Sequence, residues 1–160
     1  MVKLFLDDLR TPPPGWTLCR TLEEMFAELI EPTEVVTAIS LDHDLGNSDC
    51  NRTGYNIVRW IEGRVATQTY PYDGSYPVPE LLIHSANPVG ENNMRRGIES
   101  IHRFLDEQGI LHEPTEAAEE IRNYHHGILL AAMEADLAIR RLLGETVAVT
   151  DDLPVPEPVC

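Results

Sequence analysis

The chain of 160 residues lacks the patterns that mark several large classes of protein. Its three cysteines, Cys19, Cys50 and Cys160, are widely and oddly spaced. They form neither a zinc motif nor a disulfide framework, so we expect free thiols in a reducing compartment. No apolar run approaches the roughly 20 residues that a membrane span needs, and no signal-peptide pattern precedes the first apolar run. We therefore expect a cytoplasmic protein with no membrane partner.

Positive charge is also scarce in this sequence. Lys3 is the only lysine, and the formal net charge is -15. Such a field repels nucleic-acid backbones and anionic membrane surfaces, which disfavours a long DNA or RNA as the partner. A small phosphorylated ligand or a cyclic nucleotide is still compatible with this charge, because a local pair of arginines or a metal ion can hold a phosphate.

What the sequence does contain is three short apolar runs that each end in polar or ionisable residues. They are residues 4–6 followed by Asp7 and Asp8, residues 38–41 followed by Asp42, His43 and Asp44, and residues 81–83 followed by His84, Ser85 and Asn87. Continuous apolar runs of this length indicate strands that are buried on both faces of a parallel sheet. Ligands of such sheets bind at the carboxyl ends of the strands. Aspartates that converge there need a cation or protons to coexist, so the sequence predicts a divalent-metal site for Mg²⁺ or Mn²⁺.

The order of the elements predicts the fold class. We expect strands at 2–6, 16–20, 35–41, 81–85 and 110–111, and helices after Thr21, from about Tyr55, over 91–108 and over 115–143. Strands that alternate with helices at this spacing predict an α/β, doubly wound parallel sheet. A connection as long as residues 63–80 is often functional or mobile. Its tyrosines, Tyr70, Tyr72 and Tyr76, either stack on a nucleobase or anchor the loop.

Three regions follow from this pattern. Residues 1–113 form the α/β domain, residues 114–145 form a helical extension, and residues 146–160 form an acidic, proline-rich tail that we expect to be disordered. Thr115 is the expected cap of the long helix and Gly144 its stop. A small α/β domain does not need this helix to close its sheet. The helix therefore either packs across the domain or pairs with a second copy in a homodimer.

The order of the polar clusters resembles that of response-regulator receiver domains. Asp7 and Asp8 match the metal-binding acidic pair, Asp42 matches the phospho-acceptor, and Ser85 matches the hydroxyl residue that a small neighbour follows. The receiver's lysine after its fifth strand is absent, because no lysine follows position 3. Three segments, 4–12, 40–46 and 84–88, are more similar to a divergent family, the cyclic-phosphate processing receiver domain.

This resemblance covers roughly residues 2–112 and implies a flavodoxin-like, receiver-like sheet and a reaction class, but no substrate. Hydrolysis of a cyclic phosphodiester needs an activated water, a proton donor for the leaving hydroxyl and a cation. We assign the metal to Asp7, Asp8 and Asp42, and we assign catalysis to His43 and His84, with Asp44 beside them. The candidates for contact with phosphate oxygens are Ser85, Asn87, Asn93, Arg10, Arg95 and Arg96.

Each assignment has a purely structural alternative. The aspartates at 7 and 8 have the alternative of turn residues, and Asp44 has that of a loop cap. His43 has the alternative of a paired surface histidine, and His84 that of a hydrogen-bonded core histidine. Asn87 before a proline is a common turn residue, and the helical candidates Asn93, Arg95 and Arg96 are also typical of a solvated helix face.

Three functions remain open at this point. The first is a metal-dependent phosphoesterase that processes a cyclic phosphate of a nucleotide or of a nucleotide-derived small molecule. The second is a non-catalytic receiver-like module that binds a phosphorylated ligand or a partner protein. The third is a phospho-accepting signalling receiver that uses Asp42, against which the missing lysine argues.

Overall fold

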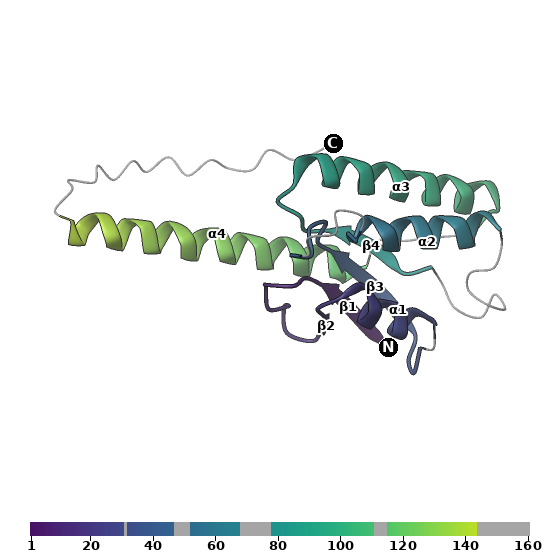
Figure 1. The fold of residues 1–160 in the computed structure, drawn as a ribbon, viewed down its shortest axis with the longest axis horizontal. Coiled ribbons are helices and arrows are strands. Elements are labelled where there is room, and N and C mark those ends of the chain that lie inside the picture. The colour runs from purple at the N-terminus through teal and green to yellow at the C-terminus, as the bar shows by residue number, and fades with distance from the viewer. Residues whose placement is uncertain (31, 47–51, 68–77, 111–114, 144–160) are drawn as a thin grey trace. The chain divides into compact units, whose positions relative to one another are not determined.

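The computed structural model describes residues 1–30, 32–46, 52–67, 78–110 and 115–143 (Figure 1). The elements follow in the order β1 (Val2–Leu6), β2 (Thr17–Cys19), α1 (Leu22–Ile30), β3 (Val36–Leu41), α2 (Tyr55–Ala66), β4 (Glu80–Ile83), α3 (Pro88–Glu107) and α4 (Glu116–Leu142). Residues Met1–Tyr124 form one compact unit, and the chain from His125 onward is a second. The candidate site lies entirely in the first unit.

The four strands form one parallel sheet in the order β2-β1-β3-β4. Leu4 of β1 pairs with Ile39 of β3, which pairs with Leu81 of β4. The structure thus confirms the predicted α/β, flavodoxin-like parallel sheet with a long helix after it. The strand expected at 110–111 falls partly outside the described residues, and Ile110 itself is not in a strand.

One face of the sheet is covered by α1, α2 and α3 (Figure 1). The connections β2–β3 and β3–β4 step in the same direction across the sheet, and right-handed crossovers therefore place α1 and α2 on the same face. Leu4 and Ile39 are fully buried there with Met25 of α1, Ile61 of α2 and Ile101 of α3. This face is the main core of the first unit.

The other face is covered by the first turns of α4. No helix joins β1 to β2, because prolines fill the middle of that short connection. Phe5 and Trp16 instead pack with Ala117 and Ile121, which are 2% and 5% exposed. The hydroxyl of Tyr124 also donates to a backbone carbonyl of the β1–β2 loop. Of the two alternatives predicted for this helix, packing across the domain therefore holds for its first turns.

Local capping explains where the helices begin. Thr21 Oγ1 accepts from the Glu24 N–H at 3.2 Å, which confirms the predicted cap of α1. Thr115 Oγ1 accepts in the same way from Ala117 at 3.1 Å and caps α4. Asn87 Oδ1 accepts from the second and third amides of α3, and Pro88 is the first helical residue. Helix α3 therefore starts three residues before the predicted start at 91, because Pro88 begins a helix here and does not form a turn.

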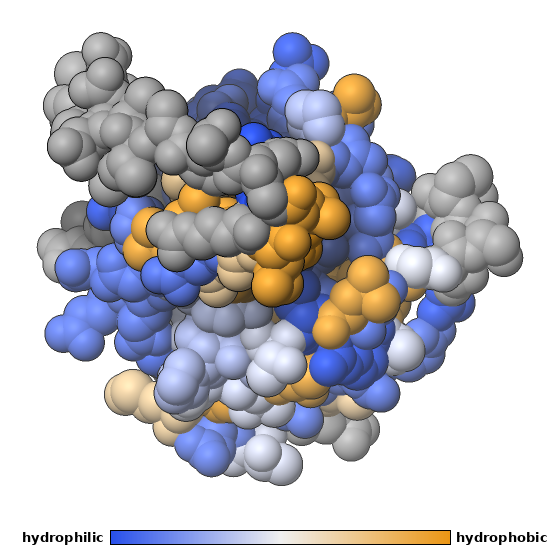
Figure 2. Space-filling view, turned by 90° about the vertical axis from the view of Figure 1, so that its left-hand side faces the viewer, coloured by the Kyte–Doolittle hydropathy of each residue, from blue (hydrophilic) through white to orange (hydrophobic). Residues whose placement is uncertain are grey.

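Beyond Tyr124, several apolar side chains of α4 are exposed. They are Ile128, Leu129, Leu130, Met133, Ile139 and Leu142. Figure 2, turned so that the left-hand side of Figure 1 faces the viewer, shows hydrophobic residues at the surface. A homodimer through this part of the helix stays a prediction. No helix among the described ranges is long and apolar enough to cross a membrane.

Several sequence-based expectations fall outside the described residues. They concern the thiols of Cys50 and Cys160, the three tyrosines of the 63–80 connection, Gly144 and the tail 146–160. Of the cysteines, Cys19 is described, and it is a buried free thiol. Burial, together with Glu28 and Glu24 nearby, raises the pKa of Cys19 to about 12. This thiol is therefore protonated near neutral pH.

Candidate metal and phosphate site

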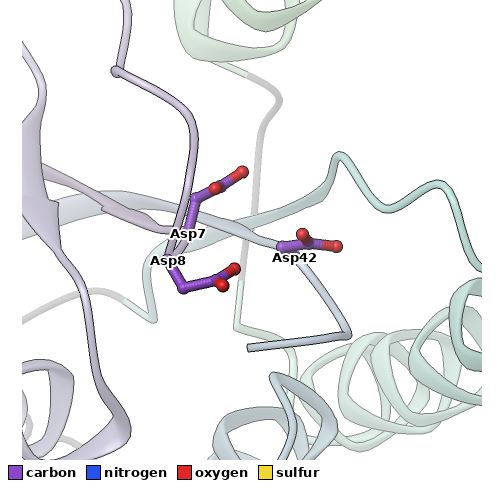
Figure 3. A group of neighbouring side chains, drawn as sticks. All are labelled: Asp7, Asp8 and Asp42. Atoms are coloured by element: carbon purple, nitrogen blue, oxygen red, sulfur yellow. The ribbon is translucent and has the colours of Figure 1, made fainter. Parts of the chain in front are cut away.

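Three aspartates meet at the carboxyl ends of β1 and β3 (Figure 3). Each of Asp7, Asp8 and Asp42 offers an oxygen, and these oxygens lie within 4.8 Å of one another. The sheet ladder continues into the group, because Asp42 N donates to Leu6 O at 2.9 Å. Three carboxylate oxygens at this spacing are a donor set that fits a hard divalent cation such as Mg²⁺. The predicted convergence of these aspartates is confirmed, and the cluster is suited to hold a metal.

Asp7 is the most firmly held of the three. Its side chain is 1% exposed, and Oδ1 accepts from the N–H groups of Leu9 and Arg10 at 2.8 and 2.5 Å. Oδ2 lies 3.2 Å from His84 Nε2. Burial alone raises the pKa of Asp7, but the hydrogen bonds from His84, Arg10 and Leu9 outweigh it and lower the pKa to about 2. Asp7 is therefore a fixed carboxylate at neutral pH.

His84 is held on both ring nitrogens. Its side chain has no exposed area, Nδ1 lies 2.7 Å from Ser40 Oγ, and Nε2 faces Asp7. Phe5 stacks on the ring, with centroids 4.1 Å apart and planes 10° apart. Since Asp7 is ionised, we assign the proton to Nε2, and Nδ1 then accepts from the Ser40 hydroxyl. The predicted role of His84 in proton exchange with a substrate does not fit this burial. Its Nε2 instead holds the Asp7 carboxylate in place.

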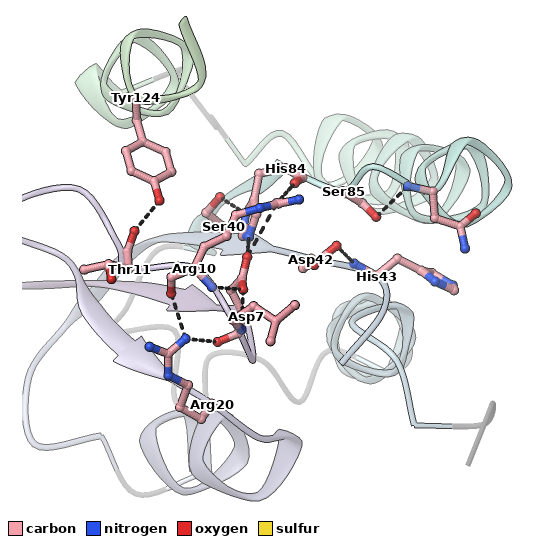
Figure 4. A network of polar contacts seen from close by, with 12 residues as sticks. Asp7, Arg10, Thr11, Arg20, Ser40, Asp42, His43, His84, Ser85 and Tyr124 are labelled. Carbon is pink, nitrogen blue, oxygen red and sulfur yellow. Dashed lines mark hydrogen bonds and ion pairs between the residues drawn. The ribbon is translucent and has the colours of Figure 1, made fainter. Parts of the chain in front are cut away.

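Two arginines clamp the loop that follows β1 (Figure 4). Arg10 NH1 donates to His84 O at 2.7 Å and lies 3.5 Å from Asp7 Oδ2. Arg20 NH1 donates to the backbone carbonyls of Asp7 and Arg10 at 3.0 and 2.7 Å. Arg10 thus lies in the site, as the sequence suggested. Arg20 supports the loop from β2.

His43 lies in a second polar chain on the other side of the cluster. Its N–H donates to Asp42 Oδ1 at 2.7 Å, and its ring Nδ1 lies 2.8 Å from Asp44 Oδ1. Asp44 Oδ2 also accepts from Asn87 Nδ2 at 3.0 Å. The hydrogen bonds from His43 and Asn87 lower the pKa of Asp44, so this carboxylate is charged at neutral pH and holds a proton on Nδ1. Within the part of the chain that the structure describes, Nε2 of His43 has no partner.

Two glycines, Gly90 and Gly46, lie directly against the side chains of His43 and Asp8. A Cβ at Gly90, at the start of α3, would lie 2.2 Å from Cγ of His43. A Cβ at Gly46 would lie 2.3 Å from Asp8 Oδ2, and Gly46 has a positive φ of 58°. The backbone therefore approaches both side chains so closely that no larger residue fits without movement.

The remaining phosphate candidates divide into two groups. Ser85 lies at the end of β4, and its Oγ accepts from Asn87 N at 3.2 Å, which leaves the hydroxyl proton for another acceptor. Asn87 uses its amide oxygen as the cap of α3 and its NH₂ group on Asp44, so its side chain orients Asp44 and is not aimed at a phosphate. The other candidates, Asn93, Arg95 and Arg96, are exposed on α3, where Arg95 pairs with Glu91, and no contact among the described residues brings them to the site.

Sequence reasoning missed three residues of this site: Ser40, Arg20 and Phe5. Ser40 carries a usable signal, because a hydroxyl inside a fully buried strand needs a partner. Arg20 follows the end of β2 and so obeys the same rule that identified the aspartates. Phe5 gives no such signal, since an aromatic residue in a buried strand is expected to pack against its neighbours in any fold.

Comparison with known proteins agrees with this geometry. A family model described as the cyclic-phosphate processing Receiver domain matches residues 2–100. Neither the curated proteins nor the solved structures include a match to the chain. The matched segment contains β1 to β4 and all of the polar groups described above. The chain therefore belongs to the cyclic-phosphate processing receiver domain family.

Proposed function

We propose that this receiver domain is a metal-dependent phosphoesterase. Its substrate is a small nucleotide, or a molecule derived from one, that carries a cyclic phosphate. The observation that supports this most directly is the His43 ring, which is oriented by Asp44 and follows directly on Asp42 of the acidic cluster. The family supplies the link to cyclic phosphates, and the net charge of -15 favours a small substrate over a long nucleic acid.

The acidic cluster and its neighbours would hold the phosphate. Asp7, Asp8 and Asp42 are the residues that would bind Mg²⁺ or Mn²⁺. Such an ion supplies positive charge for the phosphoryl oxygens and lowers the pKa of a bound water. Arg10 keeps further N–H donors for a phosphate oxygen, because its side chain is 34% exposed and one guanidinium nitrogen accounts for its contact with His84 O. Ser85 adds a hydroxyl donor.

His43 is the group that exchanges protons in this proposal. Asp44 accepts from Nδ1, so Nε2 is the nitrogen that remains to exchange a proton. Water adds to phosphorus and its proton passes to Nε2 of His43. One of the two ester P–O bonds of the ring breaks, the departing ester oxygen takes that proton from Nε2, and the product is a phosphate monoester. Acid–base help of this kind contributes about 10²–10⁴-fold in rate.

The test is hydrolysis of a panel of 2′,3′-cyclic and 3′,5′-cyclic nucleotides and cyclic dinucleotides, followed by ³¹P NMR. Each substrate is incubated with Mg²⁺, with Mn²⁺ and with EDTA. We expect turnover of one class that EDTA abolishes and that His43→Ala lowers about 10²–10⁴-fold. His126→Ala, an exposed histidine of α4, is the matched control and is expected to retain full activity.

Two outcomes would overturn the enzyme proposal. No turnover across the panel by folded protein, together with a rise in melting temperature on adding a cyclic nucleotide, would favour a binding module. Metal-dependent labelling of Asp42 by acetyl phosphate would favour a signalling receiver. Against the second outcome, Lys3 lies near the amino end of β1, where it donates to Glu120 at 2.6 Å, far along the strand from the acidic cluster.

A further inference from the structure

A second feature of the first unit has no part in the proposed hydrolysis. A groove of about 480 Å³ lies between the first turns of α1 and those of α2. It is lined by Leu22, Glu23, Phe26, Arg52, Asn56, Arg59 and Trp60. This volume is within the range of small-molecule sites, which combine apolar walls with a few placed polar groups.

The charge of the groove is opposite to that of the protein. Arg52 and Arg59 line it, and Glu23 is its single acidic residue. Glu23 forms an ion pair with Arg52, which leaves Arg52 with unused N–H donors. The groove thus carries a net positive charge on a chain with a net charge of -15. An anion that reaches the groove therefore meets two guanidinium groups and one carboxylate.

Two aromatic rings form the apolar wall. Phe26 and Trp60 meet edge to face, with centroids 5.7 Å apart and an angle of 70° between the planes. The Arg64 guanidinium lies over the Trp60 ring, 4.5 Å from its centroid, and Arg64 is not among the residues that line the groove. Arg64 therefore braces the indole from outside. Partly exposed rings that are fixed in this way are surfaces on which a nucleobase stacks.

Asn56 adds a polar group of fixed direction. Its Oδ1 accepts from Thr53 N at 2.9 Å and lies 3.4 Å from Thr53 Oγ1, which orients the side chain at the start of α2. Among the residues that the structure describes, the NH₂ group of Asn56 has no acceptor. It is therefore available to a ligand in the groove, beside the two arginines.

We propose that the α1–α2 groove binds a nucleoside monophosphate, with the base against Trp60 and Phe26 and the phosphate at Arg52 and Arg59. An anion alone would use the arginines and leave the aromatic wall exposed. A neutral ring alone would leave the two guanidinium groups of the groove without a contact to the ligand. A ligand with both a planar ring and a phosphate matches all the groups of the groove. This proposal does not depend on the phosphoesterase activity.

The experiment is isothermal titration calorimetry of the full chain in EDTA, with 5′-AMP, adenosine and inorganic phosphate as separate probes. We expect 5′-AMP to bind more tightly than either fragment. Arg59→Ala should weaken 5′-AMP binding at least about tenfold, because it removes a charged donor to the phosphate. Arg103→Ala, an exposed arginine of α3, makes the same change of charge away from the groove and should leave binding unchanged.

A fluorescence measurement locates the bound base. The chain has two tryptophans, and Trp16 is buried on the other face of the sheet. In a Trp16→Phe variant, Trp60 is the sole tryptophan, and 5′-AMP should quench its emission. Equal affinity in the wild type and in Arg59→Ala, or binding without quenching, would overturn the proposal.

The groove and the catalytic proposal can fail independently. His43→Ala should keep the groove affinity for 5′-AMP in EDTA, while it loses turnover in the hydrolysis assay. Loss of 5′-AMP binding in His43→Ala would place the ligand in the acidic site and overturn the groove assignment. Where turnover is found, a higher KM with unchanged kcat in Arg59→Ala identifies the groove ligand as part of the substrate. An unchanged KM, with 5′-AMP binding lost, identifies a separate effector.

Discussion

The two histidines beside the acidic cluster follow equivalent strand ends, yet their surroundings differ. His84 has no exposed side-chain area, and Asp7, Ser40 and Phe5 surround its ring. His43 is 16% exposed, and one ring nitrogen is held by Asp44. A proton donor needs one nitrogen fixed and the other open, and His43 meets this condition. A histidine whose two ring nitrogens both have partners, as His84 has, instead fixes the positions of those partners.

The difference teaches that the position of a histidine in the sheet does not decide its role. Both residues follow the apolar part of a parallel strand, β3 for His43 and β4 for His84. The Ser40 hydroxyl lies within hydrogen-bond distance of the ring of His84, while Asn87 holds the partner of His43 from α3. The two rings therefore differ in burial and in their partners, and this is why our proposal assigns the proton exchange to His43.

The largest effect that we expect is the difference between the two histidines in their contribution to stability. His84→Ala removes the ring that stacks on Phe5, and it takes the ring nitrogens away from Asp7 Oδ2 and from the Ser40 hydroxyl. We expect the free energy of unfolding to fall by about 3 kcal/mol. His43→Ala should cost less than about 0.5 kcal/mol, because its ring is partly exposed. Urea unfolding in EDTA measures both, and equal losses would show that the two rings are equally structural.

The close contact between Gly90 and the His43 ring allows a test of the role proposed for His43. Gly90→Ala places a methyl group within 2.2 Å of the His43 ring, which has to move. A displacement of this size is expected to lower kcat about 10²-fold. Gly127→Ala in α4, where a Cβ meets nothing within 4 Å, is the control. Full activity in Gly90→Ala would show that the observed ring position is not needed for turnover.

Asp7, the partner of the buried His84, should also affect how the stability of the protein depends on pH. The pKa of Asp7 is about 2 in the folded protein, compared with an ordinary value of 3.8. Its ionised form therefore contributes about 2 kcal/mol of stability above pH 5, which is lost as the pH falls from about 4 to 2. Unfolding of metal-free protein between pH 6 and pH 2.5 measures this loss.

Asp7→Asn provides the comparison for that measurement. The variant should be less stable at pH 6 and should lose less stability on acidification than the wild type. Asp136→Asn, at an exposed residue that pairs with Arg140, should follow the wild-type curve. An acid response that Asp7→Asn leaves unchanged would assign the loss to other groups.

The smallest expected effect comes from the residue that orients His43. The Asp44 side chain is 62% exposed, so a water molecule can replace much of the hydrogen bond that Asp44 makes to His43 Nδ1. Asp44→Ala should lower kcat about tenfold, as expected for the loss of one hydrogen bond to a charged group. Steady-state kinetics checks this, and Glu119→Ala, an exposed acid of α4, gives the matched loss of charge. A loss as large as that of His43→Ala would mean that Asp44 contacts the substrate itself.

Much of the fold could be predicted from the sequence, since apolar runs with polar ends define strands wherever a parallel sheet is buried on both faces. The meeting of Asp7, Asp8 and Asp42 follows from the same rule and is confirmed. Helix α4 was harder to place, because its apolar stripe does not reveal whether it packs on a sheet or on a second copy. The proline-rich connection between β1 and β2 is the relevant signal. It contains no helix that could cover Phe5, so this face of the sheet is open to α4.

The individual site roles could be predicted less well. A role depends on which hydrogen-bond partners surround a side chain, and those partners come from distant parts of the chain. Ser40 lies 44 residues from His84, and Asp44 lies 43 residues from Asn87. Their place on the first turns of a helix makes Arg95 and Arg96 candidates from the sequence alone. The helix turns Arg95 and Arg96 away from the core, where Met94 and Ile98 are buried.

The missing helix between β1 and β2 has a consequence for how the chain acquires its fold during synthesis. All four strands and α1 to α3 leave the ribosome before α4 does, because domains emerge from their amino ends. Until Ala117 and Ile121 emerge, the nascent sheet presents Phe5 and Ala38 to water or to a chaperone. The unit that folds is thus longer than the segment that matches the family, and the second face of the sheet is covered only after Ala117 and Ile121 have been synthesised.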